Sequence, residues 1–194
     1  YCFFSNDGQL VPAYNILMGT QNQFIVNYSF NQRKASESDG FINHMKHLQN
    51  QLHCLPQLAM GDSAYGSEEN YNWLAENKIG NYLKYNTFHK EKTRKYRSDP
   101  YRKENFLYDQ ASDVYTCSQG RLLVFKEIQY RKTLNGYQIS FRVYQCVNCD
   151  NCPVAVLCKR GESPRSIRIN PILDQFRKQA QENLDSERGI ELRK

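Results

Sequence analysis

The chain has 194 residues, which is enough for one large domain or two small ones. With 40% hydrophobic and 24% charged residues it can form an apolar core, so the composition excludes a wholly disordered chain. No apolar run approaches the roughly eighteen residues of a membrane-spanning helix, and the net charge of +6 points to a polyanionic partner if the basic residues cluster.

The N-terminal residues, Tyr1–Asp7, lack an initiator Met as well as the basic region and long apolar core of a signal peptide. The odd number of cysteines, seven, also argues against the disulfide framework of a secreted protein. We therefore expect a piece of a longer protein that works in a reducing cytosol.

The first elements alternate between strands and helices. Residues 12–19 and 24–30 predict two strands joined by a turn at residues 20–22, and the second strand is rich in β-branched and aromatic residues. An amphipathic helix of about fourteen residues follows, because apolar side chains recur at helical spacing. These side chains are Phe41, Ile42, Met45, Leu48 and Leu52. The helix start is expected to be capped by Ser36, Ser38 or Asp39.

A short apolar run over residues 58–61 ends at Asp62 and precedes a second helix over about residues 67–77. The first turn of that helix carries Glu68 and Glu69, as the helix dipole favours. Residues 80–85 predict another strand. Strands alternating with helices at this spacing indicate an α/β layer.

Positive charge begins abruptly at residue 84. Residues 1–83 carry a net charge of −3, residues 84–104 carry +5 and residues 105–194 carry +4. The middle segment contains eight cations: Lys84, Lys90, Lys92, Arg94, Lys95, Arg97, Arg102 and Lys103. It also contains four aromatic residues: Tyr85, Phe88, Tyr96 and Tyr101. Cations that neutralise phosphates and rings that stack on bases predict nucleic-acid binding. The alternative is a solvated loop whose tyrosines pack on the domain surface.

Residues 107–145 predict a β-meander. Short strands at residues 114–115 and 122–125 precede a hairpin that turns at residues 134–136, because the Asn-Gly pair there is a hairpin signal. Further on, Asn170-Pro171 is expected to cap a helix over about residues 171–184, and Ser186 starts another helix.

Clustered cysteines in this half are first interpreted as metal ligands. The cluster comprises Cys117, Cys146, Cys149, Cys152 and Cys158. Tetrahedral zinc takes four soft ligands, and a short-spaced Cys pair supplies two of them from one turn. The best set is Cys117, Cys149, Cys152 and Cys158, with Cys146 competing for one place. An iron–sulfur cluster and simply packed free thiols are the alternatives, and the isolated Cys2 and Cys54 are expected to be small buried hydrophobes.

Asp62 follows an apolar strand and precedes a helix, which is where open α/β sheets place ligand-binding groups. A carboxylate there suits Mg²⁺, which takes one or two protein carboxylates and completes its shell with water and phosphate oxygens. The alternative is that Asp62 only begins a turn, as Asp often does.

Several motifs, taken in order, resemble a DDE transposase of bacterial insertion sequences. Residues 8–15, G-Q-L-V-P-A-Y-N, are similar to the family's G-Q-x-x-P-G-Y-N, and residues 62–70, D-S-A-Y-G-S-E-E-N, to its D-[SA]-G-Y-x-S-E-E-N. Ala13 and Ala64 stand where the family has Gly. Residues 85–90, the run Cys149-x2-Cys152-Pro153-x4-Cys158 and Ser186-Glu187-x-Gly189 match one branch of the family.

The resemblance implies a mixed α/β chain in three parts. Residues 1–85 would form a partial ribonuclease-H-like core, residues 86–168 a basic, cysteine-bearing, β-rich insertion, and residues 169–194 helices that return to the core. The family's triad of Asp, Asp and Glu binds two Mg²⁺ or Mn²⁺ ions for DNA cleavage and strand transfer. Asp62 matches the second Asp; Asp7 does not match the first, which would lie before this chain, and the Glu would lie beyond Lys194.

We therefore expect part of a transposase that binds transposon-end and target DNA, and that does not act alone. The resemblance implies a bacterial, cytoplasmic protein that associates with the nucleoid, touches no membrane and forms a homodimer or a larger synaptic assembly. The alternatives are a non-catalytic zinc-ribbon module that binds nucleic acid and a decayed transposase remnant that only folds.

Overall fold

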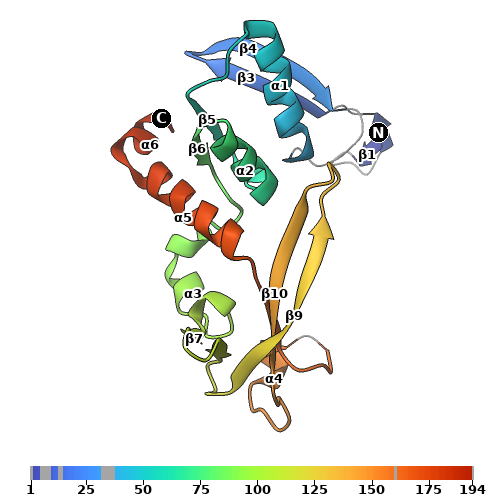
Figure 1. Ribbon diagram of the computed structural model, residues 1–194, viewed down its shortest axis with the longest axis vertical. Coiled ribbons are helices and arrows are strands. Elements are labelled where there is room, and N and C mark those ends of the chain that lie inside the picture. The colour runs from blue at the N-terminus through green and yellow to red at the C-terminus, as the bar shows by residue number, and fades with distance from the viewer. Residues whose placement is uncertain (1, 5–9, 13–14, 32–37, 160, 194) are drawn as a thin grey trace. The chain divides into compact units, whose positions relative to one another are not determined.

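The computed structural model (Figure 1) describes residues 2–4, 10–12, 15–31, 38–159 and 161–193. It contains helices, antiparallel strands and one parallel strand pair, which confirms the mixed α/β composition. The chain divides into two compact units: residues 1–88 and 175–194 form the first unit, and residues 89–174 form the second. Among the described residues, no helix is both long and apolar enough to cross a membrane.

The first unit begins with two antiparallel strand pairs. These are β1 (Cys2–Phe4) with β2 (Leu10–Pro12), and β3 (Asn15–Gln21) with β4 (Phe24–Asn31). The β3–β4 turn lies at Asn22 and Gln23, whose φ angles of 50° and 69° fit a type I′ turn. The predicted turn at residues 20–22 is wrong in position, because Thr20 and Gln21 still pair with β4. The family-like residues 8–9 and 13–14 lie outside the described residues.

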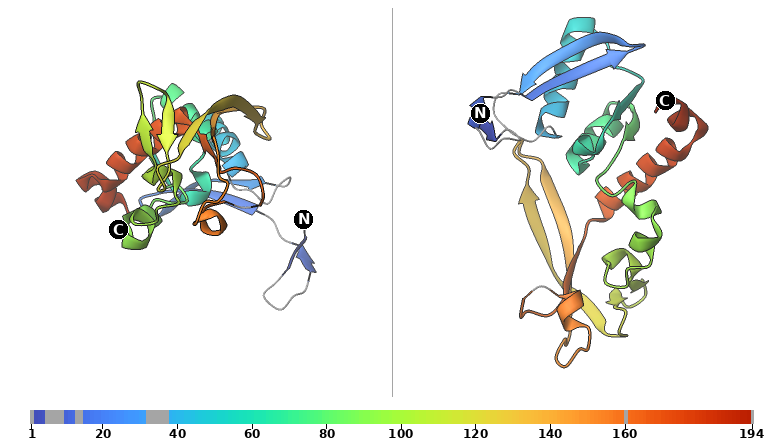
Figure 2. Two further views of the ribbon diagram at one scale, coloured as in Figure 1. Left: turned by 90° about the horizontal axis from the view of Figure 1, so that it is seen from below. Right: turned by 180° about the vertical axis from the view of Figure 1, so that it is seen from behind.

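Helix α1 (Phe41–Leu52) lies against one face of the β3–β4 hairpin (Figure 2). It buries Phe41, Met45 and Leu48 as predicted, whereas Leu52 is 49% exposed at its end. The capping prediction is wrong for Ser38 and Asp39, because these residues form a 3-10 turn, η1 (Ser38–Gly40), and Gly40 then precedes the helix. Ser36 lies outside the described residues.

A parallel crossover follows α1. It consists of β5 (Leu58–Gly61), η2 (Ser63–Tyr65), α2 (Glu68–Glu76) and β6 (Gly80–Leu83). Strands β5 and β6 pair in parallel, and the Ser67 hydroxyl accepts a hydrogen bond from the Asn70 amide at the start of α2. The predicted strand–helix–strand order is therefore confirmed. Tyr71 and Leu74 of α2 and Leu83 of β6 are almost wholly buried. Cys54, predicted to be buried, is exposed because it lies in the connection between α1 and β5.

Two helices end the chain: α5 (Pro171–Asp185), which belongs to the first unit from Gln175 on, and α6 (Glu187–Leu192). Both predicted starts are confirmed, since Asn170 Oδ1 accepts from the Leu173 amide at 2.9 Å and Ser186 Oγ from the Gly189 amide at 3.1 Å.

The second unit is a five-stranded antiparallel sheet preceded by short helical turns. The turns are η3 (Lys90–Lys92), α3 (Arg94–Arg97) and η4 (Lys103–Asn105). The strands are β7 (Leu107–Asp109), β8 (Val114–Thr116), β9 (Leu122–Lys132), β10 (Gln138–Cys146) and β11 (Ser166–Ile169), and the short helix α4 (Ala155–Cys158) lies between the last two. The spatial order β11-β10-β9-β8-β7 confirms the predicted meander.

The hairpin between β9 and β10 turns where predicted, but not as a two-residue Asn-Gly turn. The Gly136 amide bonds to the Thr133 carbonyl at 3.1 Å and the Thr133 amide to the Tyr137 carbonyl at 2.8 Å, which encloses a three-residue loop. Only Gly136, with a φ of 88°, has a left-handed conformation there. Glycine at that position is the usual choice for a three-residue hairpin loop.

Candidate functional site

Asp62 stands directly after β5, at the carboxyl end of the parallel pair. Its side chain is exposed, and its Oδ1 accepts a hydrogen bond of 2.7 Å from the Ala64 amide. This bond fixes the carboxylate at the start of the η2 turn, because Asp side chains readily accept from an amide two residues on. Oδ2 accepts no hydrogen bond from the described residues. Asp62 therefore begins a turn and still offers one open oxygen to a ligand.

The loop after Asp62 is held against the end of β6 by a close backbone approach. A Cβ atom on Gly66 would lie 2.2 Å from the Lys84 carbonyl oxygen and 2.8 Å from the Tyr71 hydroxyl. The same hydroxyl donates to the Leu83 carbonyl at 3.2 Å. Only glycine lets the loop approach this closely, so Gly66 helps to fix where Asp62 lies.

Lys84 follows β6 at the same sheet edge as Asp62. The Lys84 amide donates to the Gly61 carbonyl at 3.1 Å, so the residues that follow the two parallel strands are neighbours. Carboxyl ends of adjacent parallel strands are where α/β sheets bind ligands. Among the eight predicted cations, Lys84 alone belongs to the first unit.

Asn70 also holds the loop. Its side-chain amide donates to the Tyr65 carbonyl at 2.9 Å and to the Ser38 carbonyl at 3.1 Å, which ties the loop to the start of α1. Glu68 and Glu69, which precede it, are both buried. The local sequence identified the acidic first turn of the helix, but it carried no signal for this cross-link to a residue 32 positions away.

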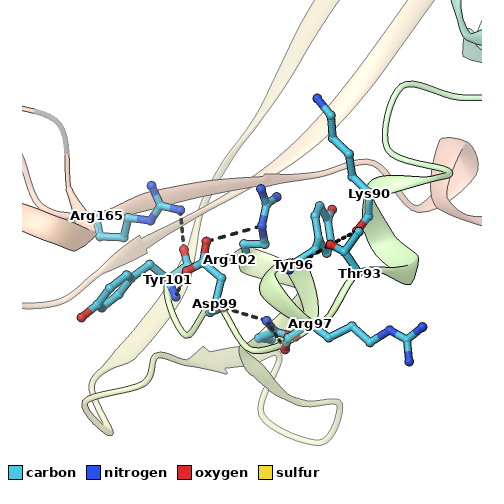
Figure 3. A network of polar contacts seen from close by, with 9 residues as sticks. Lys90, Thr93, Tyr96, Arg97, Asp99, Tyr101, Arg102 and Arg165 are labelled. Atoms are coloured by element: carbon cyan, nitrogen blue, oxygen red, sulfur yellow. Dashed lines mark hydrogen bonds and ion pairs between the residues drawn. The ribbon is translucent and has the colours of Figure 1, made fainter.

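The remaining predicted cations lie in the second unit, and their surroundings differ. Lys90, Lys92, Arg94 and Lys95 have exposed side chains on η3 and α3. Arg97 donates to the carbonyls of Glu91 and Lys92 at 3.0 and 2.9 Å. Figure 3 shows Arg97 and Arg102 beside Tyr96, Asp99 and Tyr101 in a network of polar contacts.

Arg102 and Lys103 are also engaged within the second unit. The Arg102 guanidinium lies 3.7 Å from the Tyr96 ring centroid, and its Nε is 3.5 Å from an Asp99 carboxylate oxygen. Lys103 donates to the Arg168 carbonyl at 3.0 Å. The cations predicted from the sequence to bind nucleic acid therefore include some that are exposed to solvent and some that form contacts within the second unit.

Three of the four aromatic residues of the basic segment are buried and so cannot stack on bases. Tyr85 is 2% exposed, Phe88 1% and Tyr96 9%. Tyr85 and Phe88 instead pack with Leu184 in the first unit. The expectation that these three rings stack on bases is wrong, because they are core side chains.

All five clustered cysteines line one small cavity of about 20 Å³ in the second unit. Hydrogen bonds from Arg121 and Arg165 hold its walls. Arg121 Nη1 donates to the carbonyls of Asn148 and Asp150 at 2.9 and 3.0 Å, which closes the turn that holds Cys149. The Arg165 amide donates to Cys149 Sγ at 3.4 Å.

Cys146 differs from the other four cysteines. It is 3% exposed, packs in the core cluster with Leu123 and Tyr144, and donates its thiol proton to the Asn148 carbonyl at 3.3 Å. Burial raises the pKa of the Cys146 thiol to about 11, and burial also raises the pKa of Cys158. Cys146 is therefore the most deeply buried of the five clustered cysteines, although it lines the same cavity.

Nowhere in the described part of the chain do three or more His, Cys, Asp or Glu side chains gather into a group that could hold a metal ion. This applies to the predicted ligands Cys117, Cys149, Cys152 and Cys158, and to Asp62. The four cysteines share a cavity, but their sulfur atoms line its walls and do not meet as a ligand set. The predicted zinc site is not supported by this geometry.

Residues 116–194 match the family model described as "Transposase DDE domain". The match supports a DDE transposase, a family that implies DNA as partner, DNA cleavage and transfer in transposition, and divalent metal ions. The matched segment does not include Asp62. No curated protein and no solved structure matches the chain significantly.

Proposed function

We propose that this chain is the part of a DDE transposase that contributes Asp62 to a metal-dependent site for cutting and joining DNA. The match of residues 116–194 to the transposase domain carries the family part of the proposal, while the assignment of Asp62 depends on its motif and its place in the fold. The place of Asp62 at the end of β5, next to the strand end that precedes Lys84, supports it.

Asp62 fits one oxygen ligand of a divalent ion, because its Oδ2 faces no donor among the described residues. A divalent ion bound there would polarise a phosphate oxygen and make a bound water or hydroxyl a better nucleophile. The described residues do not gather a second and third acidic ligand beside Asp62. Lys84 would neutralise a DNA phosphate at the same edge.

A ribonuclease-H-like core is a further part of the proposal, and a groove of about 200 Å³ in the first unit supports it. One wall consists of the four consecutive residues Leu17–Thr20 of β3, and the other of the three consecutive residues Leu58–Met60 of β5. Consecutive residues alternate between sheet faces, so a groove lined by all of them is bordered by strand edges. Among the described strands, β3 pairs only with β4 and β5 only with β6.

One extended segment in this groove would join both pairs into a single mixed sheet above α1, whose Phe41, Met45 and Leu48 line the groove as well. The resemblance places the first Asp of the triad on a strand. If that strand fills the groove, its carboxylate approaches Asp62 from the neighbouring position in the sheet. The synaptic dimer or larger assembly is proposed on the family resemblance alone.

Asp62→Asn in the full-length protein tests the catalytic assignment. The change keeps the hydrogen bond to the Ala64 amide but removes the charge, so we expect transposon-end cleavage to fall by at least about a hundredfold, as expected for losing several kcal/mol of charge stabilisation. Glu104→Gln, a charge-neutralising change at an exposed residue of the second unit, serves as the control. Cleavage by Asp62→Asn at the rate of this control would show that Asp62 is not a metal ligand.

A structural zinc ion at Cys117, Cys149, Cys152 and Cys158 is a second proposal. Its support is the convergence of these cysteines on one cavity and the amide that donates to Cys149 Sγ, since thiolates of zinc knuckles accept such bonds. Binding would require the four sulfur atoms to come together as a ligand set, which they do not form in this structure. A small sheet whose own core comprises few residues would gain stability from it.

Metal analysis of the purified chain tests the zinc proposal with a matched pair of variants. We expect one zinc per chain in the wild type and in Cys146→Ser, because Cys146 is a packed thiol, and none in Cys152→Ser. A wild-type chain without zinc contradicts the site, and loss of zinc in Cys146→Ser contradicts the choice of ligands.

A further inference from the structure

The long hairpin of the second unit extends beyond its sheet. Strand β8 pairs with β9 only as far as Val124, and β11 pairs with β10 only from Arg142 on. From Phe125 on, β9 therefore pairs with β10 alone, although residues 125–128 lie opposite the part of β10 that β11 also flanks. Residues 129–132 and 138–141 pair only with each other. Together with the loop at residues 133–137 these segments form a ribbon, residues 125–141, that Figures 1 and 2 show as a long arm of β9 and β10.

A β-bulge marks the point where the ribbon leaves the sheet. Val143 pairs with Glu127, whereas Tyr144 pairs with Phe125, so Lys126 has no partner across the ladder. Bulges increase the local twist and bend the strand. The bulge thus directs the ribbon out of the plane of the other strands.

No strand residue of the ribbon is buried. Ile128 is 45% exposed, Tyr130 65% and Leu134, at the tip, 68%. Two strands without a covering layer are marginally stable in water. A ribbon of this length with both faces open is therefore a surface that gains stability when a partner covers it.

The charge of the ribbon indicates the partner. The ribbon carries three cations, Lys126, Arg131 and Lys132, and one acidic residue, Glu127. The Glu127 carboxylate accepts a hydrogen bond of 2.8 Å from the Gln129 side chain. Side chains alternate between the two faces, so Lys132 and Tyr130 share one face while Arg131 lies on the other. A second copy paired along β9 would bring these cations against their equivalents, which is destabilising.

We propose that this ribbon is a DNA-binding arm that enters the major groove of double-stranded DNA, with its cations at the flanking phosphates. Eight residues of β9 span about 26 Å, and a major groove about 12 Å wide admits a two-stranded ribbon. This inference rests on the proposed function in assuming a DNA partner. It assigns the contact to residues that lie outside the basic segment at residues 84–103.

The test compares two triple variants of the 194-residue chain for binding to a 30-base-pair duplex. The ribbon variant carries Lys126→Gln, Arg131→Gln and Lys132→Gln. The control carries Lys46→Gln, Lys178→Gln and Arg188→Gln, which remove the same charge from exposed helix positions. We expect the ribbon variant to bind at least about tenfold more weakly and its slope of log K against log salt to be shallower by about two to three, since each phosphate contact contributes about 0.9.

The control variant should change both quantities much less. Tyr130→Ala, measured beside it, should weaken binding without changing the salt slope, because it removes an uncharged contact. If the wild-type chain binds DNA and the ribbon variant has the same affinity and slope, the arm is not a DNA contact, although the proposed function stands. If the wild-type chain binds no DNA, the result contradicts both the DNA-binding ribbon and the DNA partner of the proposed function. A change in sedimentation mass in place of a change in DNA affinity would assign the ribbon to a second copy and overturn the inference.

Discussion

In the first unit, helices cover strands, whereas in the second unit a sheet carries only short helical turns. Helix α2 packs on β6 and α1 on β4, and Tyr71, Leu74 and Leu83 are almost wholly buried as a result. The second unit buries one cluster in its sheet: Phe106, Leu123, Tyr144, Cys146 and Ile167. It leaves most of β9 exposed.

The second unit supplements its small core with polar contacts. Asp113 accepts hydrogen bonds from the hydroxyls of Tyr144 and Tyr108 at 2.6 and 2.8 Å, and Arg142 Nη2 lies 2.6 Å from its other oxygen. The two tyrosine hydroxyls and then Arg142 lower the pKa of Asp113. Strands covered by helices therefore depend on apolar burial. The uncovered sheet depends more on side-chain hydrogen-bond networks, and its exposed surface stays available to a partner.

The largest effect is expected from removing one buried leucine from each unit, which tests whether the two units differ in how they are stabilised. Leu74→Ala and Leu123→Ala should each cost about 2–5 kcal/mol, because both side chains are fully buried and leave a cavity. Trp73 is the only tryptophan and reports on the first unit, while far-UV circular dichroism reports on both.

We expect Leu74→Ala to move the tryptophan transition in urea, and Leu123→Ala to move only the dichroism transition. Leu107→Ala, at a side chain that is 75% exposed, is the control and should change little. If Leu123→Ala moves the tryptophan transition by the same amount, the two units unfold as one, and the contrast between them is not energetic.

Gly66→Ala tests the close approach behind Asp62. The new Cβ would meet the backbone at Lys84, so we expect a loss of about 2–3 kcal/mol in the urea unfolding of the first unit. Gly136→Ala is the matched control, because its φ is positive but the surrounding space is open, and it should cost about 1 kcal/mol. Equal costs for the two variants would mean that the contact at Gly66 can relax.

The pH dependence of stability should distinguish the first unit. Burial, and secondarily the charge of His47, lower the pKa of His44, whose Nδ1 lies 2.8 Å from Ser29 Oγ. A histidine with a lowered folded pKa stabilises fully above its unfolded pKa of about 6.5, and this contribution is lost as the pH falls through the lower folded value.

The tryptophan transition in urea should therefore shift to lower urea between pH 7.5 and 5.5. His44→Gln should reduce that shift, and His53→Asn, at an exposed position with a left-handed φ of 55°, should retain it. A shift that persists in His44→Gln would assign the pH dependence to another group.

The smallest effect is expected at Arg102 in the second unit. Arg102→Lys removes the planar contact with Tyr96 but keeps the charge near Asp99, and we expect a loss of about 0.5–1 kcal/mol in the dichroism transition. Arg94→Lys, at an exposed position of α3, is the control. If both variants have the same stability, the stacking contributes nothing and the second unit depends less on its networks than proposed.

Local signals in the sequence determined the elements that depend on neighbours in the chain. Ser67, Asn170 and Ser186 predicted the starts of α2, α5 and α6, because a side chain that caps a helix bonds to an amide within three residues. The apolar run before Asp62 likewise predicted β5. The cap of α1 was missed because a 3-10 turn occupies Ser38–Gly40 and no side chain caps the helix start.

Only the tertiary structure decided which side chains are covered. Tyr85 and Phe88 belong to a core completed by Leu184, about a hundred residues away, so no local pattern distinguishes them from stacking residues. The cysteine spacing brought five residues to one cavity, yet the placement of each sulfur depends on the surrounding sheet. Among the described strands, the open edges of β3 and β5 and the ribbon follow from strand pairing, which joins segments that are distant in the sequence.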